Sequence, residues 1–207
     1  MKNQSQTGLT LPELLIVIAI IAVMTALGVA GYQELTRINR TTSQTNALVA
    51  ALQLTRGEAI KRNTEVFVCA SNSVGTTAPQ CDTSTWEKGW IVFADPNRDD
   101  LTAVGIFSGA IPNGDDVIVG LGQGLTGGAT IQNIGFSQPN FVEYHASGRA
   151  NSTGSFVFCD SKKDVKHAHA INIGTTGLVT IAEDTDSPAD GIVNIPYGAT
   201  PGNVTCP

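Results

Sequence analysis

The segment from Gly8 to Gly31 constrains this chain more than any other part of the sequence. It reads GLTLPELLIVIAIIAVMTALGVAG, and Glu13 is its one charged residue. The 18 residues from Leu14 to Gly31 are uncharged and mostly aliphatic. About 17 to 25 such residues are needed for a helix to cross a bilayer. We therefore expect a membrane helix here, with the rest of the chain arranged around that anchor.

The polar leader before this segment points to processing at an unusual place. A secretory signal peptide is cut after its apolar region, behind small residues. Here the small residue, Gly8, precedes the apolar region. A cut between Gly8 and Leu9 therefore leaves the anchor on the mature protein.

Glu13 has two interpretations. A charged group at the centre of a membrane helix costs about 2.5 to 3.5 kcal/mol on insertion scales, and the helix dipole lowers this cost in the first turn. Glu13 is then either a stray acid near the end of an anchor or an acid that needs a cationic partner. The amino group that a cut would free at Leu9 is such a partner.

The octapeptide GLTLPELL, residues 8–15, resembles the class III leader of type IV pilins and type II secretion pseudopilins. The resemblance implies that prepilin peptidase cuts after Gly8, that the new N-terminus at Leu9 is methylated, and that Glu13 guides assembly. The first mature residue of that family is usually Phe and is Leu here. Pro12 is compatible with a helix start, because first-turn amides lack intrahelical partners.

Helix signals continue from Tyr32 to Asn63, a stretch without proline. One helix from Leu9 to about Asn63 would be roughly 80 Å long, with Gly28, Gly31 and Gly57 as points where it can bend. We expect its first half in the bilayer and its second half under a soluble domain. Apolar residues at helical spacing mark the second half: Leu35, Ile38, Leu48, Ala51, Leu52, Leu54, Ala59 and Ile60.

After residue 63 the pattern changes to short β-branched or aromatic runs separated by turn residues. Such runs predict an α+β fold in which antiparallel sheet covers the long helix. We interpret residues 120–128, GLGQGLTGG, as a loop and the tail after Glu183 as mostly turns. The predicted strands are Thr64–Ala70, Gly89–Ala94, Val104–Ser108, Val117–Gly120, Ala129–Ile134, Phe141–Ala146, Ser155–Cys159, Ala168–Ile173 and Leu178–Ala182.

All four cysteines follow the apolar segment, which favours disulfides in an oxidising compartment. Cys69 and Cys81 are close in sequence and flank a loop, which leaves Cys159 and Cys206 to pair. Four cysteines allow three pairings, so sequence alone does not fix the connectivity. Their position and Lys2 in the leader favour a cytoplasmic N-terminus, although Arg37 and Arg40 oppose it by the positive-inside rule.

The soluble part resembles the GspH/FimT family of minor pilins and minor pseudopilins. The similarity lies in VFVCA, GWIVFAD, FVEYHASGRA and GSFVFC, together with Cys81 and Trp86. It implies a type IV pilin-like fold: a leader at 1–8, a transmembrane half-helix at 9–31, an amphipathic half-helix at 32–63, and a β-rich periplasmic domain at 64–207. It also implies other pilin or pseudopilin subunits, prepilin peptidase and the inner membrane as partners.

Two motifs suggest metal sites but fit other interpretations better. Asp95 to Asp100 has the acidic spacing that begins a calcium loop, but position 6 is Asp100 instead of Gly and position 12 is Ile106 instead of Glu. An acidic turn accounts for it. His167 and His169 would share one face of a strand, and a solvated face is favoured over a metal site. The sequence predicts no metal site and no cofactor.

Enzyme motifs do not stand in a suitable context. We find no nucleophile elbow, catalytic carboxylate pair or phosphate loop between a strand and a helix. The glycines of residues 120–128 do not open a helix, so they do not predict a phosphate cradle. We therefore expect a structural protein and no enzyme.

DNA binding is disfavoured. Some FimT-like minor pilins take up DNA through a Gly-Arg-x-Arg motif near the C-terminus, but the corresponding residues 177–180 are Gly-Leu-Val-Thr. Residues 148–151, Gly-Arg-Ala-Asn, have the first arginine alone. The net charge of −6 also opposes a general affinity for nucleic acid. A modest basic or anion patch stays open, formed by Arg149, Lys162, Lys163 and Lys166.

We interpret the chain as a minor pilin of a type IV pilus that promotes initiation or tip assembly. Two predicted disulfides and an extended tail favour this over a minor pseudopilin of a type II secretion system. Before assembly we expect a single-pass inner-membrane protein with a periplasmic C-terminal domain. After assembly we expect it in the fibre or at its tip.

Overall fold

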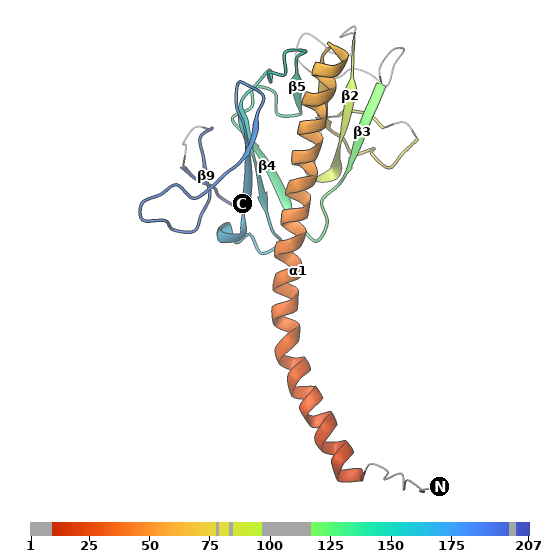
Figure 1. Cartoon of the computed structure of the whole chain (residues 1–207), viewed down its shortest axis with the longest axis vertical. Coiled ribbons are helices and arrows are strands. Elements are labelled where there is room, and N and C mark those ends of the chain that lie inside the picture. Colours follow the sequence, from red (N-terminus) through yellow and green to blue (C-terminus); the bar gives the residue numbers. More distant parts are fainter. Residues whose placement is uncertain (1–9, 78, 83–84, 97–116, 199–201) are drawn as a thin grey trace, which may run out of the picture. The chain divides into compact units, whose positions relative to one another are not determined.

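A computed structural model describes residues 10–77, 79–82, 85–96, 117–198 and 202–207, without the side chains of 26–30. The chain divides into two compact units, the first ending at Arg37 and the second beginning at Ile38. Helix α1, Leu11–Arg62, is continuous through both units (Figure 1). The three glycines at which we expected bending, Gly28, Gly31 and Gly57, are all helical.

Helix α1 ends at a left-handed residue. Asn63 has φ 55°, and the amide of Thr64 donates to the carbonyl oxygen of Ala59 at 3.3 Å. This is the Schellman arrangement, in which asparagine is one of the few residues other than glycine that tolerates the left-handed position. The predicted stop at Asn63 is therefore confirmed.

Within the part of the chain that the structure describes, no helix has both the length and the hydropathy needed to cross a membrane. The span expected at residues 9–31 includes Leu9 and the side chains of 26–30, which lie outside the described residues. That span stays a prediction.

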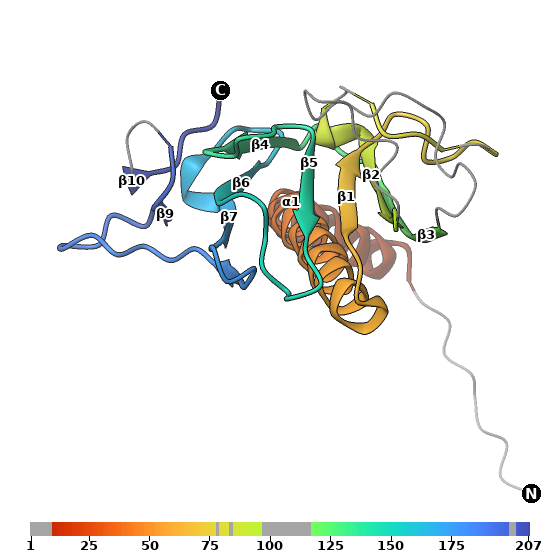
Figure 2. The ribbon, with the colours of Figure 1, turned by 90° about the horizontal axis from the view of Figure 1, so that it is seen from above.

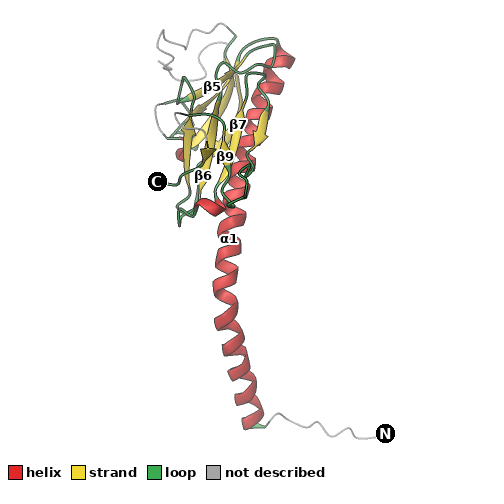
Figure 3. Cartoon of the chain, turned by 90° about the vertical axis from the view of Figure 1, so that its left-hand side faces the viewer, coloured by secondary structure: helices red, strands yellow, loops and turns green. Residues whose placement is uncertain are grey.

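The second unit contains two antiparallel four-stranded sheets, as the predicted α+β fold requires. The first has the order β3-β2-β1-β5 and the second β4-β6-β7-β8, and a two-stranded ribbon joins β9 to β10. Figure 2 shows both sheets on the same side of α1, and Figure 3 shows their strands beside it. The strands are β1 Val66–Ala70, β2 Gly89–Ala94, β3 Val117–Gln123, β4 Thr130–Ile134, β5 Phe141–Tyr144, β6 Gly154–Cys159, β7 His169–Ile173, β8 Val179–Ile181, β9 Asn194–Ile195 and β10 Gly202–Asn203. Two short 3₁₀ helices, η1 Trp86–Lys88 and η2 Val165–His167, join strands.

One stripe of α1 forms the floor of the core. Its buried residues recur at intervals of four and three, which keeps them on one face of the helix. Prediction was right for the buried residues Leu48, Ala51, Leu52 and Ala59. It was wrong for Leu35, Leu54 and Ile60, which are exposed. Threonines complete the stripe, because a hydroxyl bonded to the carbonyl four residues earlier is satisfied when buried. The stripe is Thr41, Thr45, Leu48, Leu52, Thr55 and Ala59.

The inner faces of both sheets pack on this stripe and form one hydrophobic core with it. Trp90 and Tyr144 come from the first sheet, and Phe156 and Phe158 come from the second. Trp86 of η1 joins the two, with its ring 4.8 Å from that of Phe156 in an edge-on contact. Full burial of one such side chain contributes about 1.5 to 3 kcal/mol.

The outer faces of strands β1, β2 and β6 are also buried, and a segment that a disulfide holds covers each sheet there. Cys69 of β1 is joined to Cys81 in the loop after β1, over a cluster that includes Phe67 and Phe93. Cys159 of β6 is joined to Cys206, and the tail brings Val204 onto the second sheet. The pairing that spacing favoured is confirmed.

The glycine-rich segment corrects a prediction. The predicted strand Val117–Gly120 continues as β3 through residues 121–123, which were interpreted as loop, at the edge of the first sheet. The glycines are needed because large side chains lie close to the strand. A Cβ on Gly122 would stand 2.0 Å from the Trp90 ring, and one on Gly120 would stand 3.1 Å from Leu54 Cδ2.

Other strand predictions differ from the structure in smaller ways. Gly89–Ala94 is reproduced as β2, and six further strands have bounds shifted by one or two residues at an end. Val104–Ser108 lies outside the described residues. The tail after Glu183, expected to be mostly turns, also contributes β9 and β10.

A paired glycine substitution tests the packing of β3. Gly122→Ala should lower the free energy of unfolding by about 1 to 3 kcal/mol, because the new methyl group overlaps the Trp90 ring. Gly57→Ala in α1 has nothing within 4 Å of the new Cβ and should raise that free energy by about 0.5 to 1 kcal/mol. Urea unfolding of the detergent-solubilised chain measures both. A neutral Gly122→Ala would contradict the described packing.

The two disulfides should differ in strength. They close loops with sequence separations of 47 and 12 residues. In the chain-entropy model these separations correspond to about 4 and about 3 kcal/mol. Replacing Cys159 and Cys206 together by serine should therefore destabilise the second unit more than replacing Cys69 and Cys81. Equal or reversed losses in urea unfolding would show that strain or residual structure outweighs loop length.

Candidate functional site

The described start of α1 presents apolar side chains on every face. All of them are more than two-fifths exposed within the isolated chain. A helix that is hydrophobic all round is stable when it is surrounded by other helices or by lipid. The first unit is thus a surface that needs partners. Its exposed large residues are Leu11, Leu14, Leu15, Ile16, Val17, Ile18, Ile20, Ile21, Val23 and Met24.

Glu13 lies in the first turn of this surface and caps the helix. Its Oε2 accepts from the backbone amide of Thr10, at an N···O distance of 3.5 Å. Thr10 immediately precedes the helix and Glu13 is the third helical residue, which is the spacing of a capping box. Sequence analysis missed this local role, although the pattern T-x-x-E before an apolar run signals it. Gly8 and Leu9, where we expect cleavage and methylation, lie outside the described residues.

The histidine prediction is wrong in its geometry. His167 ends η2, whose start Asp164 caps by accepting from the amide of Lys166, and only His169 lies in β7. The two therefore do not share a strand face. His167 Nδ1 lies 3.3 Å from the Asp164 carboxylate, and His169 Nε2 lies 3.1 Å from the hydroxyl of Thr42 on α1. Burial, and then the charge of His167, lower the pKa of His169.

The four basic residues of the expected patch come from two connections of the chain. Arg149 lies in the connection before β6, whereas Lys162, Lys163 and Lys166 follow that strand. All four are exposed, and a shared patch stays a prediction. Asp160 and Asp164 also stand among the lysines and accept from their backbone amides.

Most of the calcium-like acidic motif lies outside the residues that the structure describes. Asp95 is fully buried just after β2, and residues 97–100 lie outside the described residues.

Tyr144 of β5 is fully buried on the inner face of the first sheet, and its hydroxyl has no hydrogen-bond partner among the described residues. Burial raises its pKa, so it stays a neutral core residue.

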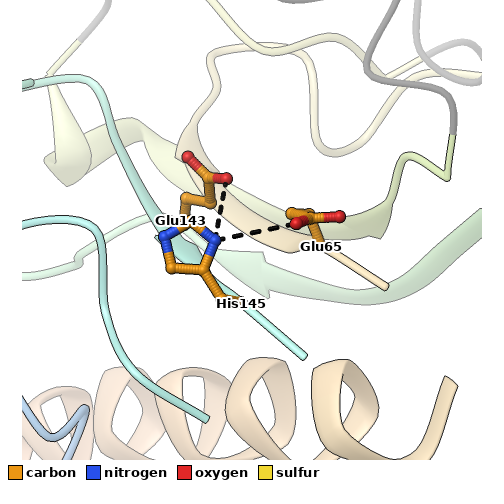
Figure 4. Close-up of side chains that lie close together, drawn as sticks. All are labelled: Glu65, Glu143 and His145. Carbon is orange, nitrogen blue, oxygen red and sulfur yellow. Dashed lines mark ion pairs between the residues drawn. The ribbon is translucent and has the colours of Figure 1, made fainter. Parts of the chain in front are cut away.

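A cluster that sequence analysis missed lies at one end of the first sheet. It consists of Glu65, Glu143 and His145, and we call it the Glu-Glu-His cluster. Its members come from before β1, from β5 and from the turn after β5. Both carboxylates are directed toward one imidazole nitrogen (Figure 4). In the sequence, the segment FVEYHASGRA places Glu143 and His145 two residues apart. Glu65 joins them only through the pairing of β1 with β5.

Comparison with known proteins identifies the class of the chain. The family model described as type II transport protein GspH matches residues 44–177, and the prokaryotic N-terminal methylation motif matches residues 3–29. No curated protein matches the chain.

Two solved structures are similar in fold. The type IV minor pilin FimU of Pseudomonas aeruginosa has a TM-score of 0.49 and 16% identity, covering 72% of this chain and 92% of that one. The minor pseudopilin EpsH from the type 2 secretion system of Vibrio cholerae has a TM-score of 0.44 and 11% identity, covering 71% and 99%.

The GspH match covers more than half of the chain and includes α1 from residue 44 onward, both disulfide-bearing strands and most of the two sheets. The methylation motif covers the leader and the start of α1. The chain therefore belongs to the GspH family of pilin-like and pseudopilin-like proteins, and it carries the N-terminal methylation motif.

Proposed function

We propose that this chain is a minor pilin that prepilin peptidase processes and that is incorporated into a type IV pilus, where it promotes initiation or tip assembly. Family membership supports a subunit of a pilin or pseudopilin assembly, and the methylation motif supports the processing. The observation that carries the proposal is the start of α1. There a single acid lies in the first turn of a helix whose large apolar residues are exposed on every face.

The apolar surface accounts for two locations of one subunit. Before assembly, residues 9–31 anchor the chain in the inner membrane, with the disulfide-bonded unit in the periplasm. During assembly the same side chains exchange lipid contacts for contacts with the helices of neighbouring subunits. Because lipid tails are as apolar as leucine, hydrophobicity alone does not drive that exchange.

The apolar surface alone does not fix how far one subunit's helix is shifted along its neighbour's. Glu13 supplies an interaction that fixes this axial register. A carboxylate has two oxygens, and one of them accepts from Thr10. The second is available in the proposal for the methylated amine of a neighbouring subunit's first residue. Two unit charges 4 Å apart attract by about 4 kcal/mol at an effective dielectric constant of 20. That attraction sets the register between subunits.

A minor pseudopilin of a type II secretion system is the second candidate. The description of the matched family, type II transport protein, favours it. Two disulfides that hold covers on both sheets favour the pilus, since a fibre outside the cell needs a domain that resists unfolding. Deleting the gene distinguishes the two, because loss of surface pili with normal secretion of exoproteins supports the pilus, and the reverse supports secretion.

Processing is the first prediction from this proposal. Protein purified from membranes should begin at Leu9 and carry one N-methyl group, because prepilin peptidase cuts after Gly8. N-terminal mass analysis measures both features. Gly8→Val should leave the leader in place, since the small residue before the cut is lost. Wild-type chain that starts at Met1, or within residues 26–31, would refute the proposal.

The second prediction separates the charge of Glu13 from its capping role. Glu13→Ala should reach the membrane in normal amounts, since a charge is removed from an apolar segment, but should be depleted from sheared pili. Glu13→Gln retains an acceptor for the Thr10 amide and loses the charge, so it should be depleted as strongly. Glu13→Asp should be intermediate or poor, because its shorter side chain lengthens the ion pair.

The comparison is membrane abundance against abundance in sheared pili for wild type and the three variants. Leader cleavage serves as a control, because Gly8 and Leu9 are unchanged in each variant. Wild-type levels of Glu13→Gln in the pilus fraction, with Glu13→Ala depleted, would show that the cap matters and the charge does not.

A further inference from the structure

The sheet register places the Glu-Glu-His cluster on the outer face of the first sheet. Val66 of β1 pairs with Tyr144 of β5, so the preceding residue, Glu65, lies level with His145. Because side chains alternate along a strand, Glu143 and His145 share a face, and Phe67 opposite Glu143 identifies it as the outer one. The cluster is therefore fixed by main-chain pairing between segments almost 80 residues apart.

A tight turn fixes the backbone of His145. The amide of His145 donates to the carbonyl oxygen of Arg149 at 3.0 Å, and the amide of Gly148 donates to the carbonyl oxygen of His145 at 2.7 Å. Gly148 has φ +76°, a conformation that favours glycine. Asn151 fixes the neighbouring strand, since its Oδ1 accepts from the amide of Glu143 at 3.1 Å. The donor atoms thus stand on rigid backbone.

The distances within the cluster suit a shared ion better than direct hydrogen bonds. His145 Nδ1 lies 3.5 Å from Glu143 Oε1 and 3.7 Å from Glu65 Oε1, and the three donor atoms all lie within 4.8 Å of one another. An N–H···O hydrogen bond spans about 2.7 to 3.2 Å. Two ligands at about 2.0 to 2.1 Å from a tetrahedral metal ion are about 3.4 Å apart.

Burial and charge support the same interpretation. Glu143 is only 4% exposed. Asp95, the residue that follows β2, is fully buried. The Asp95 amide donates to the Glu65 carbonyl oxygen at 3.4 Å, so a further acid stands at the same end of the sheet. A divalent cation bound here would offset the negative charge that these carboxylates bring to one end of the sheet. One imidazole beside two carboxylates is a donor set that suits zinc, whereas calcium takes oxygen ligands.

We propose that Glu65, Glu143 and His145 bind one divalent transition-metal ion of the zinc class, with water at the open position. The ion would join the segment that follows α1 to the turn after β5, and so lock one end of the first sheet. This departs from the prediction, made from sequence alone, that the chain has no metal site. It does not depend on whether the chain serves a pilus or a secretion system.

The test uses the full chain in detergent micelles, stripped with EDTA and then titrated with ZnCl₂. Calorimetry and elemental analysis after dialysis should give one zinc per chain, and zinc should raise the melting temperature. Glu65→Gln and His145→Gln should each weaken zinc binding at least about tenfold and abolish the shift. Both side chains are partly exposed, so these variants should fold even if a change at buried Glu143 prevents folding.

His167→Gln is the matched control, because His167 is similarly exposed and also stands beside two carboxylates, Asp160 and Asp164. It should bind zinc as the wild type does. Cobalt(II) should give tetrahedral absorption bands that disappear in His145→Gln and persist in His167→Gln. Absence of stoichiometric zinc in the wild type, or equal binding by wild type, Glu65→Gln and His145→Gln, would overturn the proposal. Zinc lost on Asp186→Asn and retained in His145→Gln would place the ion in the acidic 184–190 loop and would overturn it too.

Discussion

The second unit depends on the burial of one narrow stripe of α1 beneath two sheets. Leu48 and Leu52 are fully buried there, and the inner faces of both sheets meet on them. A stripe of large residues throughout would hold the sheets farther from the helix. Three threonines and Ala59 keep it thin, and the buried hydroxyls of Thr45 and Thr55 donate to the helix's own carbonyl groups. The sheets can therefore approach the helix closely while these buried hydroxyls keep their hydrogen-bond partners.

That arrangement leaves each sheet with a second apolar face. A single helix covers only the inner faces, so β1, β2 and β6 need cover on the other side as well. Short segments with few apolar residues of their own supply it, and a disulfide ties each one down. Cross-linking compensates for the small area that such segments bury. The cysteines and the sheet architecture are thus parts of one solution.

Patterns that repeat locally were predictable from sequence, and features that depend on a distant partner were not. Strand β2 follows from its run of β-branched and aromatic residues, and the helix end follows from Asn63, a residue type that tolerates the left-handed conformation. The sequence alone did not indicate that Gly122 lies in a strand, because a glycine is needed there only to make room for the Trp90 ring. His167 was placed in a strand because the cap from Asp164 was overlooked. At the candidate sites, Glu13 was found through its motif, whereas Glu65 meets His145 only through register.

The capping box at the start of α1 has a consequence for recognition. A free glutamate side chain explores many rotamers, and fixing it against a partner costs up to about 2 kcal/mol of conformational entropy. The hydrogen bond from Thr10 has already restricted Glu13 within its own chain. A cation that meets the other carboxylate oxygen finds a preorganised acceptor, so more of the electrostatic attraction remains as binding free energy. In the proposed assembly, Glu13, which caps the helix, therefore also lowers the entropy lost when two helices meet.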